Sequence, residues 1–208
     1  MIFPFTPDFR RRLAERCDAF PRQTAETEGL KRSAVAITLV DAGDGSGEAA
    51  VLLTRRAPRL RAHAGQWALP GGRIDADETA EAAARREFEE ELGAALPEAS
   101  VLGALDDYPT RSGYVIHPIV AWLEEVRAIR ANPHEVAAVY RVRLDEISRP
   151  GAVSFVDIPE SDRPVIRIRF GDGRFHAPTA AMVYQLLELA AGRVTRVDHL
   201  EQPVFAWR

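Results

Sequence analysis

The chain has 208 residues, of which 46% are hydrophobic, and a formal net charge of −4. This size and apolar content predict one domain with a sizeable core, and the acidic balance argues against a nucleic-acid partner. No segment approaches the roughly 18 apolar residues of a membrane-spanning helix, and the N-terminus lacks the apolar run of a signal peptide, so we expect a cytoplasmic protein with no membrane partner.

The first half of the chain predicts one helix and one hairpin. An amphipathic helix is expected over residues 7–19, with Thr6 as its N-cap. Cys17 falls on this helix, where we expect a small core residue; as the only cysteine, it excludes an intrachain disulfide and a cysteine zinc cluster. Two apolar, β-branched runs follow at 33–41 and 49–55, and the glycine-rich turn between them predicts a hairpin.

The second half continues as a mixture of strands and helices. Strands are predicted at 99–105, 114–123, 135–143 and 166–170, the last of which alternates strictly and is followed by a glycine turn. A final helix is predicted at about 178–191. Strands interleaved with a few helices indicate an α/β layered fold.

The most informative segment is rich in glutamate. Glu87, Glu90 and Glu91 stand at positions i, i+3 and i+4, a spacing that shares one face of an α-helix. Like charges on one turn repel each other unless a cation lies among them, and oxygen ligands suit a hard divalent ion such as Mg²⁺.

The residues around these glutamates predict the helix itself. An apolar stripe recurs every four residues: Ala80, Ala84, Phe88 and Leu92. Thr79 or Asp77 is suited to the N-cap, and Gly93 to the C-terminal stop. The carboxylates would therefore project at the edge of the buried surface.

This segment resembles the signature of the Nudix hydrolases, G-x5-E-x7-R-E-U-x-E-E-x-G-U, in which U is a bulky aliphatic residue. The fixed positions that match in register are Gly72, Glu78, Arg86, Glu87, Glu90, Glu91 and Gly93. A solvated, charged helix is the alternative, but it requires neither the glycine entrance nor this spacing. The resemblance implies an α/β Nudix fold, a mixed β-sheet sandwiched between α-helices, and metal-dependent hydrolysis of a diphosphate linkage.

The resemblance also implies roles for individual residues. The implied ligands of one or more Mg²⁺ or Mn²⁺ ions are Glu87, Glu90 and Glu91. Arg86 is implied to orient the glutamates, pairing with Glu78. The general base stays open between Glu87, Glu90, no protein base at all, and Glu135, for which a surface carboxylate is the competing interpretation.

Residues 52–72 resemble a second signature, that of the coenzyme A diphosphatase branch, L-L-T-x-R-S-x3-R-x3-G-x3-F-P-G-G. The matching residues are Leu52, Leu53, Thr54, Arg56, Arg61, Gly65, Pro70, Gly71 and Gly72. Ala57 replaces the serine and Leu69 the phenylalanine. Near the C-terminus, residues 175–181 keep Thr179 and Ala180 of a tryptophan-glycine-x-threonine-alanine sequence but lack its first two residues. These departures leave the particular substrate open.

An arginine-rich loop lies just before the glutamate helix in this otherwise acidic chain. Guanidinium groups bind phosphate oxygens bidentately without losing their charge, and coenzyme A carries a 3′-phosphate besides its diphosphate. We expect Arg55 and Arg59 to be solvated, whereas His63 could either contact substrate or pack. The predicted substrate-binding residues are Arg56, Arg61, His63, Gly65, Gly71 and Gly72.

Three functions follow as hypotheses. The first is hydrolysis of coenzyme A, or of a derivative, to 3′,5′-ADP and 4′-phosphopantetheine. The second keeps the chemistry and changes the substrate to ADP-ribose, a dinucleotide or a nucleoside triphosphate, and the third is a non-catalytic ligand sensor. The expected partner is a small-molecule diphosphate, and a homodimer is left open. We expect a helix and linker packing on the core (1–30), the Nudix hydrolase domain (31–192) and a C-terminal extension (193–208).

Overall fold

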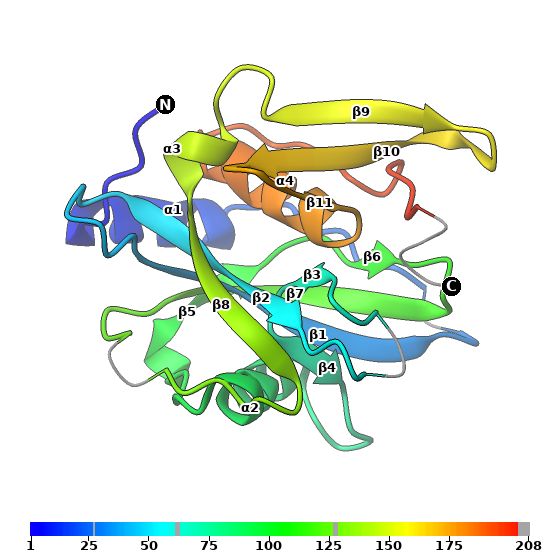
Figure 1. The fold of residues 1–208 in the computed structure, drawn as a ribbon, viewed down its shortest axis with the longest axis horizontal. Helices are drawn as coiled ribbons and strands as arrows, with labels where there is room; N and C mark the ends of the chain where they lie inside the picture. Colours follow the sequence, from blue (N-terminus) through cyan, green and yellow to red (C-terminus); the bar gives the residue numbers. More distant parts are fainter. Residues whose placement is uncertain (27, 61–62, 127–128, 204–208) are drawn as a thin grey trace.

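A mixed β-sheet forms the centre of the protein in the computed structural model, which describes residues 1–26, 28–60, 63–126 and 129–203 (Figure 1). Its strands are β1 (Lys31–Asp41), β2 (Ala49–Arg56), β3 (Trp67–Ala68), β4 (Gly71–Arg73), β5 (Val101–Ala104), β6 (Tyr108–Pro109), β7 (Tyr114–Trp122) and β8 (Val136–Arg143). The main strand order is β3-β2-β1-β7-β5, with β4 on β1, β6 on β7 and β8 on β2. The β1–β7 pair is parallel, and the other pairs described in this sheet are antiparallel.

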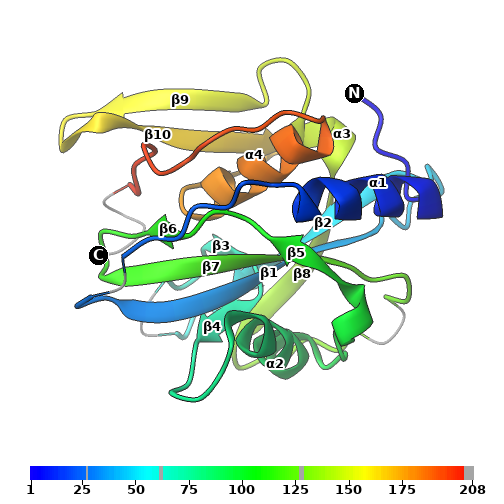
Figure 2. The same ribbon diagram turned by 180° about the vertical axis from the view of Figure 1, so that it is seen from behind.

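Helices cover both faces of this sheet. They are α1 (Pro7–Asp18), α2 (Ala80–Leu92) and α4 (Thr179–Ala190), besides the short α3 (Leu144–Ile147) and a 3₁₀ turn at Glu98–Ser100. Figures 1 and 2 show α2 on one face of the sheet and α1 with α4 on the other. A second, antiparallel sheet of β9 (Val153–Ile158), β10 (Ser161–Phe170) and β11 (Gly173–His176) lies beyond α4. The predicted mixed sheet between helices is confirmed.

Two hydrophobic clusters hold these layers together. Phe88 and Leu92 of α2 are buried in one cluster against the sheet, and Phe9 and Leu13 of α1 are buried in the other. Cys17 is buried with them, as expected of a small core residue. Because each helix presents only one apolar face, the opposite face of α2 remains free to carry charged side chains.

The helix ends follow the expected capping chemistry. The Thr6 hydroxyl accepts a hydrogen bond from the Phe9 amide at 3.3 Å, and the Thr79 hydroxyl accepts one from the Ala82 amide at 3.1 Å. Gly93 ends α2 with a φ of 64°, a left-handed conformation that favours glycine. Thr79, rather than Asp77, is therefore the cap of α2.

The structure corrects some of the expected elements. The strand expected at 99–105 begins only at Val101, because the 3₁₀ turn precedes it. Six elements were not predicted: α3, β9, β11, β3, β4 and β6. All but β9 have only two to four residues, too few to display a clear period, and the six residues of β9 are half-buried or exposed without a regular alternation. Within the described residues, no helix combines the length and the apolarity required to cross a membrane.

Candidate active site

Arg86 binds several carboxylates at the surface of α2. Its Nε and Nη2 atoms donate to the two oxygens of Glu78 at 3.0 Å each, so the predicted pair is present and bidentate. Its Nη1 donates to Glu87 Oε1 at 2.7 Å and lies 3.4 Å from Glu90. Nη2 also donates to the Arg73 carbonyl at 3.0 Å, which ties α2 to β4. The guanidinium therefore fixes the orientation of Glu78 and Glu87 relative to the glycine entrance.

The two carboxylates bound by Arg86 differ in their electrostatics. The hydrogen bond from Arg86 lowers the pKa of Glu78. Burial raises the pKa of Glu87 despite the contact with Arg86, and the charges of Glu90 and Glu135 raise it further. The hydrogen bonds to Glu78 and Glu87 raise the pKa of Arg86, which stays charged. Of the two carboxylates bound by Arg86, Glu87 is thus the one whose negative charge is disfavoured by burial.

Glu91 is the most strongly perturbed carboxylate of the site. It is only 3% exposed, and its Oε2 atom is buried without a hydrogen-bond partner among the described residues. Burial raises its pKa to about 8; Arg56 opposes this shift, while Glu135 and Glu87 reinforce it. A buried, partly unpaired carboxylate is unfavourable for folding. Carboxylates with a strongly raised pKa cluster at functional sites, where a positively charged ligand can pair with them.

The two glycines of the entrance make room for their neighbours. A Cβ atom on Gly72 would lie 2.3 Å from the Glu87 carboxyl group, and one on Gly71 would lie 2.3 Å from the carbonyl oxygen of Ala34. Gly72 pairs with Ala34 where β4 runs along β1. Only glycine therefore lets β4 lie against β1 and the Glu87 carboxylate at once.

The donor set fits a divalent cation, although the described side chains are not yet gathered around one point. Within the described residues, no three His, Cys, Asp or Glu side chains form a group that could hold a metal ion. The Arg86 guanidinium lies between Glu87 and Glu90 and binds both carboxylates. A metal ion held by these two residues would compete with Arg86 for their oxygens. The unpartnered Glu91 oxygen and the hard carboxylate donors nevertheless match the ligands that Mg²⁺ and Mn²⁺ prefer.

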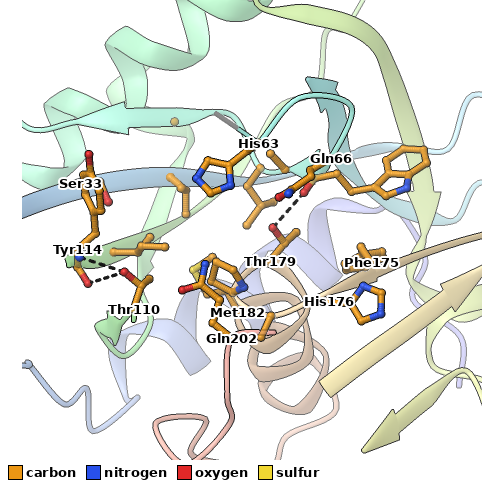
Figure 3. Close-up of a pocket in the computed structure, with 18 of the residues that line it drawn as sticks. Ser33, His63, Gln66, Thr110, Tyr114, Phe175, His176, Thr179, Met182 and Gln202 are labelled. Carbon is orange, nitrogen blue, oxygen red and sulfur yellow. Dashed lines mark hydrogen bonds between the residues drawn. The ribbon is translucent and has the colours of Figure 1, made fainter. Parts of the chain in front are cut away.

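A cavity of about 850 Å³ lies beside these carboxylates. Its near wall is formed by the glycine entrance and the arginine-rich loop, including Arg56, His63, Gly71, Gly72 and Arg73. Its far wall is formed by β10, β11 and the start of α4, including Arg167, Arg174, Phe175, His176 and Thr179. Figure 3 shows His63 and Gln66 on one side of the cavity, and Met182 and Gln202 on the other. The volume is typical of a small-molecule site.

Four of the predicted substrate-binding residues line this cavity: Arg56, His63, Gly71 and Gly72. Gly65 does not line it among the described residues; it forms a turn with a φ of 67°, and its amide donates to the Arg56 carbonyl at 3.2 Å. Arg61 lies outside the described residues. His63 adopts a left-handed φ of 57°, which is uncommon for a residue with a side chain.

The predicted glutamates themselves do not line the cavity. Gly72, whose missing side chain makes room for Glu87, and Arg56, whose charge acts on Glu91, connect the cavity to the carboxylates. Arg56 Nε is buried without a hydrogen-bond partner among the residues described here. The cavity therefore adjoins the carboxylate cluster through Gly72, which both signatures contain, and Arg56, which belongs to the second signature alone.

The departures from the second signature have different surroundings. Ala57 is 1% exposed, does not line the cavity, and donates its amide to the Glu135 carbonyl at 2.8 Å. Leu69 is buried in the core and contributes to the cavity wall. His176 and Ala177, which stand at the tryptophan and glycine positions, both line the cavity. The replacement of the serine thus changes a buried position, whereas the replacement of the tryptophan-glycine sequence changes the wall of the cavity.

Sequence reasoning missed Arg167 and Arg174 on the far wall. Arg167 alternates with buried isoleucines along β10, a pattern that also describes any half-exposed strand. Arg174 follows the glycine turn that begins β11. Nothing local to either residue connects it with a loop more than 90 positions away in the sequence, so no local signal could have placed it in this cavity.

The fold and the site define an α/β protein in which a glutamate-bearing helix, α2, adjoins an arginine-lined cavity. The chain matches the NUDIX domain family over residues 30–162 and belongs to it. It is 39% identical over 109 residues to an uncharacterized Nudix hydrolase NudL of Photorhabdus laumondii, covering 52% of this chain and 58% of that relative. It is 35% identical over 139 residues to an uncharacterized Nudix hydrolase NudL of Escherichia coli, covering 66% and 70%.

A solved structure agrees at the level of fold. A MutT/nudix family protein from Enterococcus faecalis superposes with a TM-score of 0.55 at 20% identity, covering 76% of this chain and 61% of that one. At this identity the likeness concerns the fold alone. The chain spans a little over half the length of the Photorhabdus relative. The family match ends at residue 162, so α4 and the far wall of the cavity lie outside it and are described from this structure alone.

Proposed function

We propose that this protein hydrolyses the diphosphate linkage of coenzyme A or of a coenzyme A derivative, using Mg²⁺ or Mn²⁺, to give 3′,5′-ADP and 4′-phosphopantetheine. The observation that carries the proposal is Glu91, a buried carboxylate with an unpartnered oxygen beside an arginine-lined cavity. Burying such a group destabilises the fold. A divalent cation would offset that cost, because its positive charge would pair with the deprotonated, buried carboxylate.

The chain's own residues would divide the chemistry among them. Glu87, Glu90 and Glu91 would hold the cation, which when bound neutralises the diphosphate and lowers the pKa of a water molecule. Arg86 keeps Glu87 oriented through its hydrogen bond. Arg56, at the near wall, is placed to stabilise charge on a phosphate oxygen.

Glu135 is the candidate for the base that takes the proton from the attacking water. Its charge raises the pKa of both Glu87 and Glu91, so it lies within electrostatic reach of the cluster. Asn132 Nδ2 donates to Glu135 Oε1 at 3.3 Å, which orients this carboxylate. Its half-buried position favours this role over that of a fully solvated surface carboxylate.

Coenzyme A is favoured over other diphosphates by the residues of the second signature. Arg56, Gly71 and Gly72 of that signature line the cavity. The missing serine does not count against this substrate, because Ala57 is buried and does not line the cavity. The replaced tryptophan-glycine sequence does line the cavity, and this favours a second candidate: the same chemistry on ADP-ribose, a dinucleotide or a nucleoside triphosphate.

The test is a panel of coenzyme A, ADP-ribose, NADH and a nucleoside triphosphate, each with Mg²⁺, Mn²⁺ or EDTA, with products identified by chromatography. Metal-dependent release of 3′,5′-ADP from coenzyme A, faster than cleavage of the others, supports the proposal. Preferred cleavage of another member would transfer the proposal to that substrate. Binding without turnover of any of them would favour the ligand-sensor hypothesis.

A further inference from the structure

The far wall of the cavity carries a second pair of arginines, separate from the residues of both signatures. Arg167 and Arg174 line the cavity there together with His176. In the β10–β11 hairpin, Arg167 stands directly opposite His176, and Arg174 lies two residues before His176 on the same strand. The three side chains therefore share one face of the hairpin.

The two arginines of this wall lack carboxylate partners among the described residues. Among the described residues, neither Arg167 nor Arg174 forms a salt bridge, and Arg167 donates only to the hydroxyl of Ser154, at 3.1 Å. The pKa of His176 is lowered by burial and then by the charges of Arg167 and Arg174, which shows that the three groups interact. The like charges of Arg167 and Arg174 repel each other across the hairpin unless an anion lies between them. The arrangement is therefore suited to an anionic ligand.

The two cationic walls face one cavity from different parts of the fold. The near wall adjoins the carboxylates through Gly72. The far wall belongs to the small β9–β11 sheet, and Figure 3 shows His176 of this sheet on the opposite side of the cavity from His63. The Thr179 hydroxyl donates to the Trp67 carbonyl at 3.5 Å, which holds the start of α4 against the near wall. A ligand that carries a second anionic group besides a diphosphate could therefore contact both walls at once.

We propose that Arg167, Arg174 and His176 bind a phosphate monoester of the substrate, distinct from the scissile diphosphate, and so select substrates that carry such a group. This inference rests on the proposed diphosphatase activity. For coenzyme A, the monoester is the 3′-phosphate of the ribose. Arginine suits this task because its planar fork matches phosphate oxygens and keeps its charge.

The test compares coenzyme A with dephospho-coenzyme A, which differs only by this phosphate. Arg174→Gln and Arg167→Gln are each expected to raise KM for coenzyme A about tenfold, the effect of losing one charge-assisted hydrogen bond, and to leave KM for dephospho-coenzyme A nearly unchanged. Arg169→Gln is the matched control, because Arg169 pairs with Arg174 across the hairpin but does not line the cavity. An equal change in KM for both substrates would overturn the inference.

A binding measurement separates failure of this inference from failure of the proposed activity. By calorimetry without added metal, the wild-type protein should bind 3′,5′-ADP at least about tenfold more tightly than 5′-AMP, and Arg174→Gln should abolish that preference. This result would support the monoester site even if neither coenzyme is hydrolysed. Equal affinity for the two nucleotides in the wild type would refute the site, whatever the activity.

Discussion

Replacing Glu91 with glutamine is expected to stabilise the metal-free protein at alkaline pH. Burial raises the pKa of Glu91 from its ordinary value of 4.5 to about 8. The pKa of Glu91 is thus higher in the folded protein than in the unfolded chain. Its contribution to the free energy of unfolding is therefore complete below about pH 4.5 and is lost as pH rises to about 8. Between pH 5 and pH 8 this loss amounts to about 3 kcal/mol. Glutamine resembles the neutral acid and cannot ionise, so Glu91→Gln should escape the loss.

The measurement is thermal unfolding in EDTA from pH 5 to pH 8. For a chain of this length, about 3 kcal/mol corresponds to a shift of roughly 5–10 °C in Tm. The gap between wild type and Glu91→Gln should widen by that amount as pH rises, whereas Glu89→Gln, on the exposed side of the same helix, should follow the wild type. Parallel curves for wild type and Glu91→Gln would refute the reasoning.

Three further substitutions test the surroundings of Glu91. Gly72→Ala would place a Cβ 2.3 Å from the Glu87 carboxyl group; we expect a folded protein by circular dichroism with at least about tenfold weaker Mn²⁺ binding by calorimetry, and unchanged binding would contradict this. Arg86→Lys cannot make the bidentate contact with Glu78, so kcat should fall at least about tenfold with KM little changed; wild-type kcat would argue against an orienting role. Phe88→Ala, at a fully buried position, should cost about 3–5 kcal/mol in urea unfolding, and a loss below about 1 kcal/mol would show that α2 does not anchor the site.

Residues close in sequence specify much of this fold. The β1–β2 hairpin, β7, α1 and α4 follow from apolar patterning and turn residues, and the ends of α2 follow from Thr79 and Gly93. The Glu78–Arg86 pair was implied by a family signature rather than by spacing. Local patterns suffice here because capping bonds and amphipathic faces are set by residues within a few positions of one another.

The site itself was less predictable, because its properties depend on tertiary packing. Helical spacing places Glu90 and Glu91 each one turn from Glu87, yet the Glu90 side chain is 55% exposed and Glu91 is buried. The difference arises from how α2 lies on the sheet, which spacing does not encode. In the same way, Arg174 and His63 line one cavity only because the β9–β11 sheet folds back over the main sheet, beyond α4. Separations of this kind leave no periodic trace in the sequence.

The central claim, that the α2 carboxylates support metal-dependent hydrolysis, is tested most directly by turnover of coenzyme A in the presence of Mn²⁺. The proposal predicts that wild type and Glu89→Gln release 3′,5′-ADP at equal rates, and that Glu91→Gln is folded but slower by at least about 100-fold. Turnover by Glu91→Gln close to that of the wild type, or wild-type turnover that EDTA does not reduce, would contradict the account.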